Sequence, residues 1–249
     1  MSSTLIIQSH RSPLPYRWLS QCLESVSEWC EQNYFHYRFL GDELFDLLDP
    51  SIIEKTSTQK VITSDIARLI AIRQALIEGY TRVVWLDADF LIFDPASFIL
   101  SDASYALGRE VWVQQDKQKR LKVYSKIHNA FLMFTKDNSF LDFYIETAIG
   151  LVLKNTGTMP PQFVGPKFLS AIHNIACLPV MESAGMLSPA VIKDILGGEG
   201  KALSLFKSKS PQIIAGANLC CSSVESLQIE PQEMEVLIDI LLNSKEVFL

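Results

Sequence analysis

The feature that most constrains the fold is an apolar run that ends in two acids. Val83–Leu86 is followed directly by Asp87-Ala88-Asp89. An uninterrupted apolar run is typical of a central strand that is buried on both faces of a sheet. Side chains two residues apart in a strand share a face, so an extended Asp87 and Asp89 would direct both carboxylates into one space. Two neighbouring carboxylates are costly without a cation, and a divalent metal ion is the natural candidate.

The residues before this run alternate between strand-like and helical patterns. Thr4–Gln8 predicts a buried strand, Leu14–Glu31 an amphipathic helix and Tyr34–Leu40 a second strand. This order indicates an α/β fold with a mixed, mostly parallel central sheet that is flanked by helices. No linker-like or repetitive stretch divides the 249 residues, so we predict a single domain over 1–249.

Two polar residues follow the first predicted strand. Ligands of open α/β sheets bind outside the carboxyl ends of the strands. We therefore expect Gln8 and His10 to lie at the rim of a ligand site.

A helix is predicted over Ser64–Glu78, directly before the central strand, with Thr63 or Ser64 as its N-cap. Asp65 and Arg68 are three residues apart and therefore share a face of this helix. Taken alone, the pair is best explained as a solvated ion pair near the helix N-terminus, where an acid is favoured.

The remaining two thirds of the chain continue the alternation. The patterns predict strands over Tyr105–Leu107, Val111–Gln114, His128–Phe134 and Gln212–Ala217. They predict helices over Phe140–Lys154, from Gly165-Pro166 onward and over Pro231–Leu242, and short helices over Ser97–Leu100 and after Ser188-Pro189. Asp116–Lys126 is predicted to be a solvated basic loop.

Composition excludes several classes of protein. The net charge of −6 argues against a nucleic-acid-binding protein, which usually carries an excess of basic residues. The five cysteines show no spacing that is typical of zinc sites. No apolar run approaches the roughly 18–20 residues of a membrane span, and no signal peptide is recognisable. We expect a cytoplasmic protein with at most peripheral membrane contact.

Two acids at the end of a buried strand suit two kinds of chemistry. Mg²⁺ and Mn²⁺ take oxygen ligands and are often held by one or two carboxylates together with substrate phosphates, as in transfer from a nucleotide-sugar. Phosphatases of the haloacid-dehalogenase type also place such a motif after an apolar strand, with the first acid, here Asp87, as the nucleophile. In those enzymes the motif usually lies near the N-terminus and has Thr or Val where this chain has Leu91.

A longer pattern distinguishes between these alternatives. Ser64-Asp65-Ile66-Ala67-Arg68, an apolar strand and Asp87-Ala88-Asp89 together resemble the sugar-binding region of certain glycosyltransferases of the GT-A (Rossmann-like) fold. Initiating α-mannosyltransferases and the glucosyltransferase domains of clostridial toxins have this pattern. The resemblance implies that Asp65 and Arg68 contact the donor, and that Asp87 and Asp89 hold Mn²⁺ or Mg²⁺ against its diphosphate.

One further segment of the chain matches this family, and another departs from it. Asn129-Ala130-Phe131 is similar to the start of a family strand whose Asn lies near the donor sugar. The family often completes its metal site with a late His, or with an acid or Asn accompanied by Ser and Trp, whereas this chain has Ala217-Asn218-Leu219-Cys220-Cys221. Asn218 is the best substitute for that ligand. The missing His also leaves open a non-catalytic protein that binds a sugar nucleotide on the same fold.

The predicted function is metal-dependent transfer of a hexose from a UDP- or GDP-sugar to a glycan, lipid-linked sugar, protein or small molecule, and the resemblance implies retention of the anomeric configuration. Residues 1–115 would bind the donor and 116–249 the acceptor. The predicted residues are Asp89 and Asn129 for catalysis, Gln8, His10, Asp65, Arg68 and Asp87 for donor binding, and Asp87, Asp89 and Asn218 for the metal ion.

Overall fold

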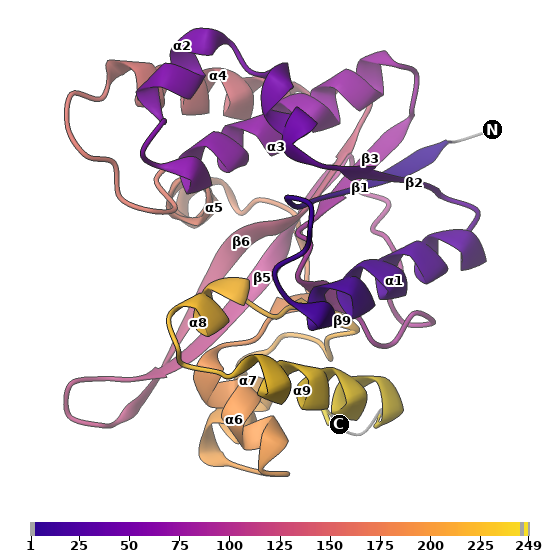
Figure 1. Cartoon of the computed structure of the whole chain (residues 1–249), viewed down its shortest axis with the longest axis vertical. Helices are drawn as coiled ribbons and strands as arrows, with labels where there is room; N and C mark the ends of the chain where they lie inside the picture. Colours follow the sequence, from indigo (N-terminus) through magenta and orange to yellow (C-terminus); the bar gives the residue numbers. More distant parts are fainter. Residues whose placement is uncertain (1–2, 245–246, 249) are drawn as a thin grey trace.

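A six-stranded sheet with the strand order β2-β1-β3-β6-β5-β7 forms the centre of the computed structural model, which describes residues 3–244 and 247–248. The pairs β1–β2, β1–β3 and β5–β7 are parallel, whereas β3–β6 and β5–β6 are antiparallel. The predicted mixed α/β sheet is therefore confirmed (Figure 1). The strands are β1 (Thr4–Ser9), β2 (His36–Leu40), β3 (Arg82–Leu86), β5 (Tyr105–Gln115), β6 (Leu121–Thr135) and β7 (Val180–Met181).

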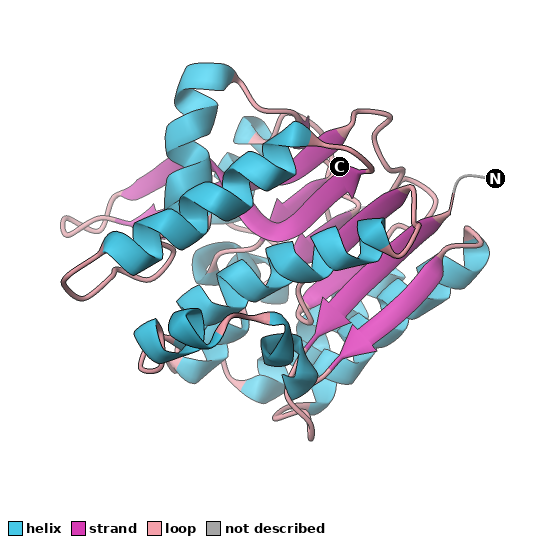
Figure 2. Cartoon of the chain, turned by 90° about the horizontal axis from the view of Figure 1, so that it is seen from above, coloured by secondary structure: helices cyan, strands magenta, loops and turns pink. Residues whose placement is uncertain are grey.

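Helices cover both faces of this sheet (Figure 2). Alternating side chains of the central strands point to opposite faces, as the strand period requires. Val83 and Trp85 belong to one apolar cluster with α3 and α4, whereas Val84 and Leu86 belong to another with α1. The uninterrupted apolar run of β3 is explained by this double burial. The helices on these faces are α1 (Arg17–Gln32), η1 (Asp42–Leu47), α2 (Pro50–Lys55), α3 (Lys60–Ile77), α4 (Ser139–Lys154) and α5 (Pro166–Ala176).

A three-stranded sheet brings the C-terminal part of the chain to the end of β3. Its order is β4-β9-β8, and Phe90 of β4 pairs with Asn218 of β9. This pairing joins segments that lie more than a hundred residues apart in sequence. The elements of this part are β4 (Phe90–Ile92), β8 (Ala184–Met186), β9 (Gly216–Asn218), α6 (Pro189–Leu196), α7 (Lys201–Lys209), α8 (Cys221–Glu225) and α9 (Pro231–Asn243).

The segment predicted as a solvated basic loop is mostly strand. β5 and β6 form one long antiparallel ribbon that projects from the body in Figure 1, and only its tip is a turn. Asp116 closes that tip by accepting hydrogen bonds from the N–H groups of Gln118 and Arg120. The loop prediction was wrong because Leu121 and Val123, on either side of Lys122, pack against the C-terminal apolar cluster.

Three smaller predictions were also wrong. α3 begins at Lys60 with Gln59 as its N-cap, and Thr63 lies inside the helix, where its hydroxyl donates to Thr56 Oγ1. Residue 97 ends a turn and residues 98–100 are irregular, so no helix forms there. The last strand, predicted over Gln212–Ala217, is shorter and lies over Gly216–Asn218 as β9. Among the described residues, no helix combines the length and the apolar character needed to cross a membrane.

Candidate functional site

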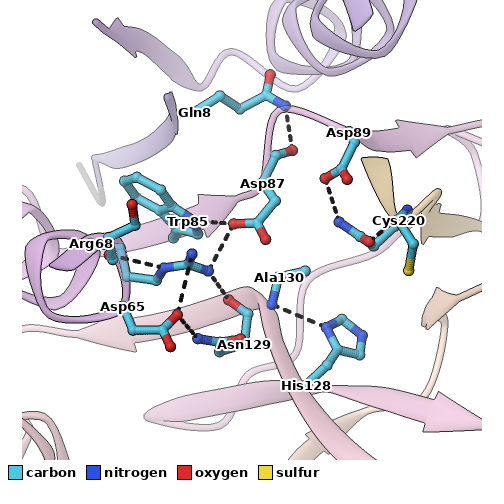
Figure 3. Close-up of polar contacts among 12 residues, drawn as sticks. Gln8, Asp65, Arg68, Trp85, Asp87, Asp89, His128, Asn129, Ala130 and Cys220 are labelled. Atoms are coloured by element: carbon cyan, nitrogen blue, oxygen red, sulfur yellow. Dashed lines mark hydrogen bonds and ion pairs between the residues drawn. The ribbon is translucent and has the colours of Figure 1, made fainter. Parts of the chain in front are cut away.

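The two acids lie in a tight turn, not in an extended strand. β3 ends at Leu86, and the Phe90 N–H donates to the Asp87 carbonyl at 2.9 Å. The Asp87 N–H donates to Ala130 O of β6 at 3.0 Å. The Leu219 N–H donates to the Asp89 carbonyl at 2.9 Å. The turn is thus held from both sides, and its two carboxylates have different hydrogen-bond partners (Figure 3).

The Asp87 carboxylate faces α3. Its Oδ1 accepts hydrogen bonds from Arg68 Nη1 at 2.8 Å and from the Trp85 indole Nε1 at 2.7 Å (Figure 3). The guanidinium also lies over the Trp85 ring, 5.4 Å from its centroid. Among the described residues, no side chain or backbone group donates to Asp87 Oδ2. One oxygen is therefore fixed by the protein, and the other is available to a ligand.

The Asp89 carboxylate faces the C-terminal segment. Oδ1 accepts from Asn218 Nδ2 at 2.5 Å, and Oδ2 accepts from the Cys221 N–H at 2.7 Å. Burial, followed by repulsion from the Asp87 carboxylate, raises the pKa of Asp89 to about 6. Hydrogen bonds from the Cys221 N–H, the backbone N–H of Asp89 itself and the Asn218 amide oppose this rise in pKa without cancelling it. The acid pair therefore lacks full compensation by protein charge.

Asp65, Arg68 and Asn129 form a buried cluster beside Asp87. Asn129 Nδ2 donates to Asp65 Oδ1 at 2.7 Å, and Arg68 Nη2 lies 3.4 Å from the same oxygen. Arg68 Nη1 also donates to Asn129 O at 2.9 Å. The interpretation of Asp65 and Arg68 as a solvated ion pair was wrong, because Arg68 is only 8% exposed and binds three segments of the chain.

One carboxylate oxygen of this cluster has no partner. Asp65 Oδ2 is buried, and no described group donates to it. Burial is the main cause that raises the pKa of Asp65. Gly165 packs directly on this oxygen, since a Cβ added at residue 165 would lie 2.7 Å from Oδ2 and 2.8 Å from Asn129 Nδ2. Buried carboxylate oxygens without a partner are uncommon and suit a ligand that supplies a hydroxyl donor.

Two predicted site residues support the acids from within the protein. Gln8 is fully buried, donates from Nε2 to the Asp87 carbonyl at 3.1 Å and accepts from the Tyr37 hydroxyl at 3.0 Å. Asn218 accepts the Cys220 N–H on its Oδ1 at 2.9 Å, which turns its amide nitrogen toward Asp89. In this orientation Asn218 presents no oxygen to the acids, so the geometry does not fit its prediction as a metal ligand.

His128 is a neutral structural residue in this arrangement. Its Nδ1 accepts the Ala130 N–H at 3.1 Å, so Nε2 carries the proton and donates to Ala184 O at 3.2 Å. Burial lowers the pKa of His128 to about 4. Gly108 lies against the imidazole, where a Cβ would come within 2.1 Å of the ring. His128 therefore fixes the strand position of Asn129.

A cavity of about 410 Å³ opens over the turn. Of the predicted residues, His10, Arg68, Asp87 and Asp89 line it, whereas Gln8, Asp65, Asn129 and Asn218 lie behind its wall. Sequence reasoning missed several lining residues, and these include the charged residues Arg11, Asp42, Lys60 and Glu225 and the indole donor Trp85. The spacing of Trp85 and Asp87, two residues apart, was the one signal that pointed to their contact.

The comparisons with known proteins agree with this architecture. No protein-family model matches the sequence, and no curated protein matches it. A solved glycosyltransferase involved in glycosylation of the major capsid of PBCV-1 superposes with a TM-score of 0.50 at 16% identity, over 93% of this chain and 98% of that one. The chain has the fold of a glycosyltransferase. The galactosyltransferase LgtC, solved with donor and acceptor sugar analogues, reaches a TM-score of 0.46 at 11% identity, over 98% of both chains.

The chemistry of the acid pair suits a hard divalent cation. Asp87 Oδ2 accepts no hydrogen bond among the described residues, and burial together with repulsion from Asp87 disfavours the charged form of Asp89. Within residues 3–244 and 247–248, no group of three or more His, Cys, Asp or Glu side chains is arranged to hold a metal ion. Two carboxylates suffice where phosphate oxygens and water supply the other ligands, as is usual for Mg²⁺. The residues fit a cation that arrives together with a diphosphate.

Proposed function

We propose that the chain is a glycosyltransferase that takes a hexose from a nucleotide-diphospho-sugar. One observation carries the proposal: the Asp87–Asp89 turn lies at the floor of a cavity at the carboxyl end of β3, beside the buried Asp65–Arg68–Asn129 cluster. The position is the one where open α/β sheets bind ligands. The glycosyltransferase fold supports the same conclusion.

Three cations and four acids line the cavity, namely Arg11, Lys60 and Arg68, and Asp42, Asp87, Asp89 and Glu225. Arg11 lies just after β1 and Lys60 begins α3, and neither forms a side-chain ion pair among the described residues. Arg68 adds a guanidinium that already donates hydrogen bonds to Asp87 and to the Asn129 carbonyl. A bound diphosphate would meet two uncommitted cations, and charge-assisted contacts of this kind are among the stronger hydrogen bonds in proteins.

Asp87 and Asp89 would hold Mn²⁺ or Mg²⁺. When bound, the cation supplies Lewis-acid stabilisation of the charge that develops on the leaving diphosphate. The Arg68 and Trp85 donors orient the Asp87 carboxylate. Asn218 and the Cys221 N–H do the same for Asp89, so we assign Asn218 to positioning.

Asp65 and Asn129 would position the hexose. Asp65 Oδ2 lies behind the cavity wall and accepts no hydrogen bond among the described residues, so a sugar hydroxyl would reach it only if the segment of Gly165 moved aside. Asn129 Nδ2 is committed to Asp65 and acts by fixing it. In the reaction the bond from the anomeric carbon to the diphosphate oxygen breaks, and a bond to the acceptor oxygen forms. The acceptor's proton passes to the departing phosphate oxygen if attack occurs from the same face, which gives retention without a dedicated base.

Turnover of donors by the full chain tests the proposal. UDP- and GDP-hexoses are incubated with Mn²⁺ or Mg²⁺, and release of the nucleoside diphosphate and of free or transferred sugar is measured. We expect at least one donor to turn over, and Asp87→Asn to abolish turnover while the exposed control Asp239→Asn retains it. Tight donor binding without any turnover would instead favour a non-catalytic binding protein, and covalent capture of Asp87 by a phosphate analogue would favour a phosphatase.

A further inference from the structure

A groove lies between the outer end of the β5–β6 ribbon and α7. Gln115 and Leu121, which pair with each other at that end of the ribbon, line one wall. One face of α7 lines the other wall, with Ser204 and Ser208 about one turn apart. The volume of the groove is about 710 Å³, within the range of roughly 300–1,000 Å³ that small-molecule sites occupy. It shares no lining residue with the cavity over the acid pair, so the proposed donor chemistry does not use it.

The charged residues that line this groove are all cations. Lys119 and Arg120 come from the ribbon and Lys201 from α7, and no acid of the described residues lines the groove. Arg120 is already paired with Asp116 at 3.0 Å. Lys119 and Lys201 are exposed and form no ion pair within the described part of the chain. Because the whole chain carries a net charge of −6, this positive charge is a local feature, and it favours an anionic ligand.

The two serines of α7 indicate which other groups this ligand carries. Ser204 Oγ donates to Gly200 O at 2.9 Å, and Ser208 Oγ donates to Leu205 O at 2.9 Å. Each hydroxyl proton is thus used within the helix, and the oxygen lone pairs are left to accept hydrogen bonds. A ligand that matches both features of the groove has negative charge for the lysines and hydroxyl donors for the serines.

We propose that this groove binds an acidic oligosaccharide whose sugars carry carboxylate groups. The carboxylates would accept charge-assisted hydrogen bonds from Lys119 and Lys201, which are stronger than hydrogen bonds between neutral groups. The sugar hydroxyls would donate to Ser204 and Ser208. Binding in the groove requires neither the donor nor a metal ion.

Two other anionic partners fit the groove less well. The side chains of an acidic peptide offer carboxylates to the lysines but no hydroxyl donor to the serines. An anionic membrane surface is bound best where large apolar side chains project beside the basic residues. The leucines of the groove, Leu121 and Leu205, instead pack against the C-terminal apolar cluster.

The binding test uses the full chain without donor or metal ion, so its outcome does not depend on transferase activity. The probes are trigalacturonate and its methyl ester, which share the sugar hydroxyls and differ in charge. Trigalacturonate should shift the backbone amide resonances of Lys119, Lys201 and Ser204 saturably in ¹H–¹⁵N spectra. The ester should bind at least 10-fold more weakly.

Two double variants that remove the same amount of charge separate the groove from general attraction. Lys119→Gln/Lys201→Gln should weaken trigalacturonate binding at least 10-fold. Lys55→Gln/Lys154→Gln removes exposed lysines at the ends of α2 and α4 and should bind trigalacturonate as the parent does. Asp87→Asn should also bind it as the parent does, although we expect that variant to lack turnover.

Four results would overturn the proposal. Trigalacturonate at millimolar concentration leaves the groove resonances unmoved, the ester binds as tightly as the acid, or the two double variants lose affinity equally. In the fourth, triglutamate amide, which has the same three side-chain carboxylates without sugar hydroxyls, or vesicles of phosphatidylglycerol shift the groove resonances at least as strongly as trigalacturonate. That result would assign the groove to an acidic peptide or to a membrane surface.

Discussion

Arg68 Nη1 lies 2.8 Å from Asp87 Oδ1, and this contact joins α3 to the turn that follows β3. The same guanidinium donates to Asn129 O of β6 and lies within ion-pair distance of Asp65. One side chain therefore links α3, the turn after β3 and β6 at the floor of the proposed donor site.

Arg68→Met should destabilise the protein by about 3–5 kcal/mol, because it leaves two carboxylates without their buried partner. The free energy of unfolding in urea measures this loss. Arg38→Met is the matched control, since Arg38 pairs with Glu78 at the surface and such pairs contribute about 0–1 kcal/mol. A loss for Arg68→Met as small as that of the control would contradict the linking role of Arg68.

Asp89 should make stability depend on pH in a defined direction. Its folded-state pKa of about 6 lies above the unfolded value of about 3.9, so folding favours the protonated acid. The stability that protonated Asp89 provides is present below about pH 4 and is lost as the pH rises through 6.

Comparison with Asp89→Asn isolates this contribution. Relative to that variant, the metal-free protein should lose roughly 2 kcal/mol in its free energy of unfolding between pH 4.5 and pH 7.5. A difference between the two proteins that stays constant with pH would show that Asp89 titrates normally. Mn²⁺ affinity should rise over the same pH interval, because the ligand must be deprotonated.

The substitution Asn218→Asp tests whether Asn218 orients the Asp89 carboxylate or binds the metal ion itself. The substitution replaces the donor that faces Asp89 Oδ1 by a third carboxylate, so the metal-free protein should lose about 2–4 kcal/mol at pH 7.5. Added Mn²⁺ should restore much of that loss, which a thermal-shift titration measures. Asn155→Asp, at the C-cap of α4, should change stability by less than about 1 kcal/mol and show no such rescue. Equal responses of the two variants to Mn²⁺ would contradict the assignment.

Gly165→Ala should disturb the sugar-positioning cluster. The new methyl group would lie 2.7 Å from Asp65 Oδ2, so the Asp65–Asn129 pair has to shift. We expect at least a 10-fold loss in kcat/KM for the donor with the nucleoside diphosphate affinity unchanged. Gly150→Ala, in the middle of α4 with no neighbour within 4 Å, should retain activity and gain about 0.5–1 kcal/mol. Unaltered donor kinetics in Gly165→Ala would remove Asp65 from the proposed site.

Periodicity predicted the first strands and helices well because β1, α1 and β3 are decided by which side chains they bury. The pair Asp65 and Arg68 could be connected to Asp87 only through the family resemblance. Spacing alone favoured a surface pair, and the tertiary contact of Arg68 with Asn129, 61 residues away, is not encoded in any local pattern.

The closure of the site from the C-terminal side could not be predicted. Asn218 reaches Asp89 because β9 pairs with β4, but the orientation of its amide is set by the Cys220 backbone N–H. The second donor to Asp89 is a backbone group of Cys221, which no residue type signals. The division into donor and acceptor parts at about residue 115, and the choice of donor sugar, remain predictions.

The most direct test of the central claim is calorimetric titration of UDP- and GDP-hexoses into the full chain with and without Mn²⁺. The account predicts that at least one donor binds, that omission of Mn²⁺ weakens binding at least 10-fold, and that Asp87→Asn and Asp89→Asn abolish the Mn²⁺ effect while Asp239→Asn preserves it. Donor binding that is equal with and without Mn²⁺, or equal in the two site variants and the parent, would contradict it.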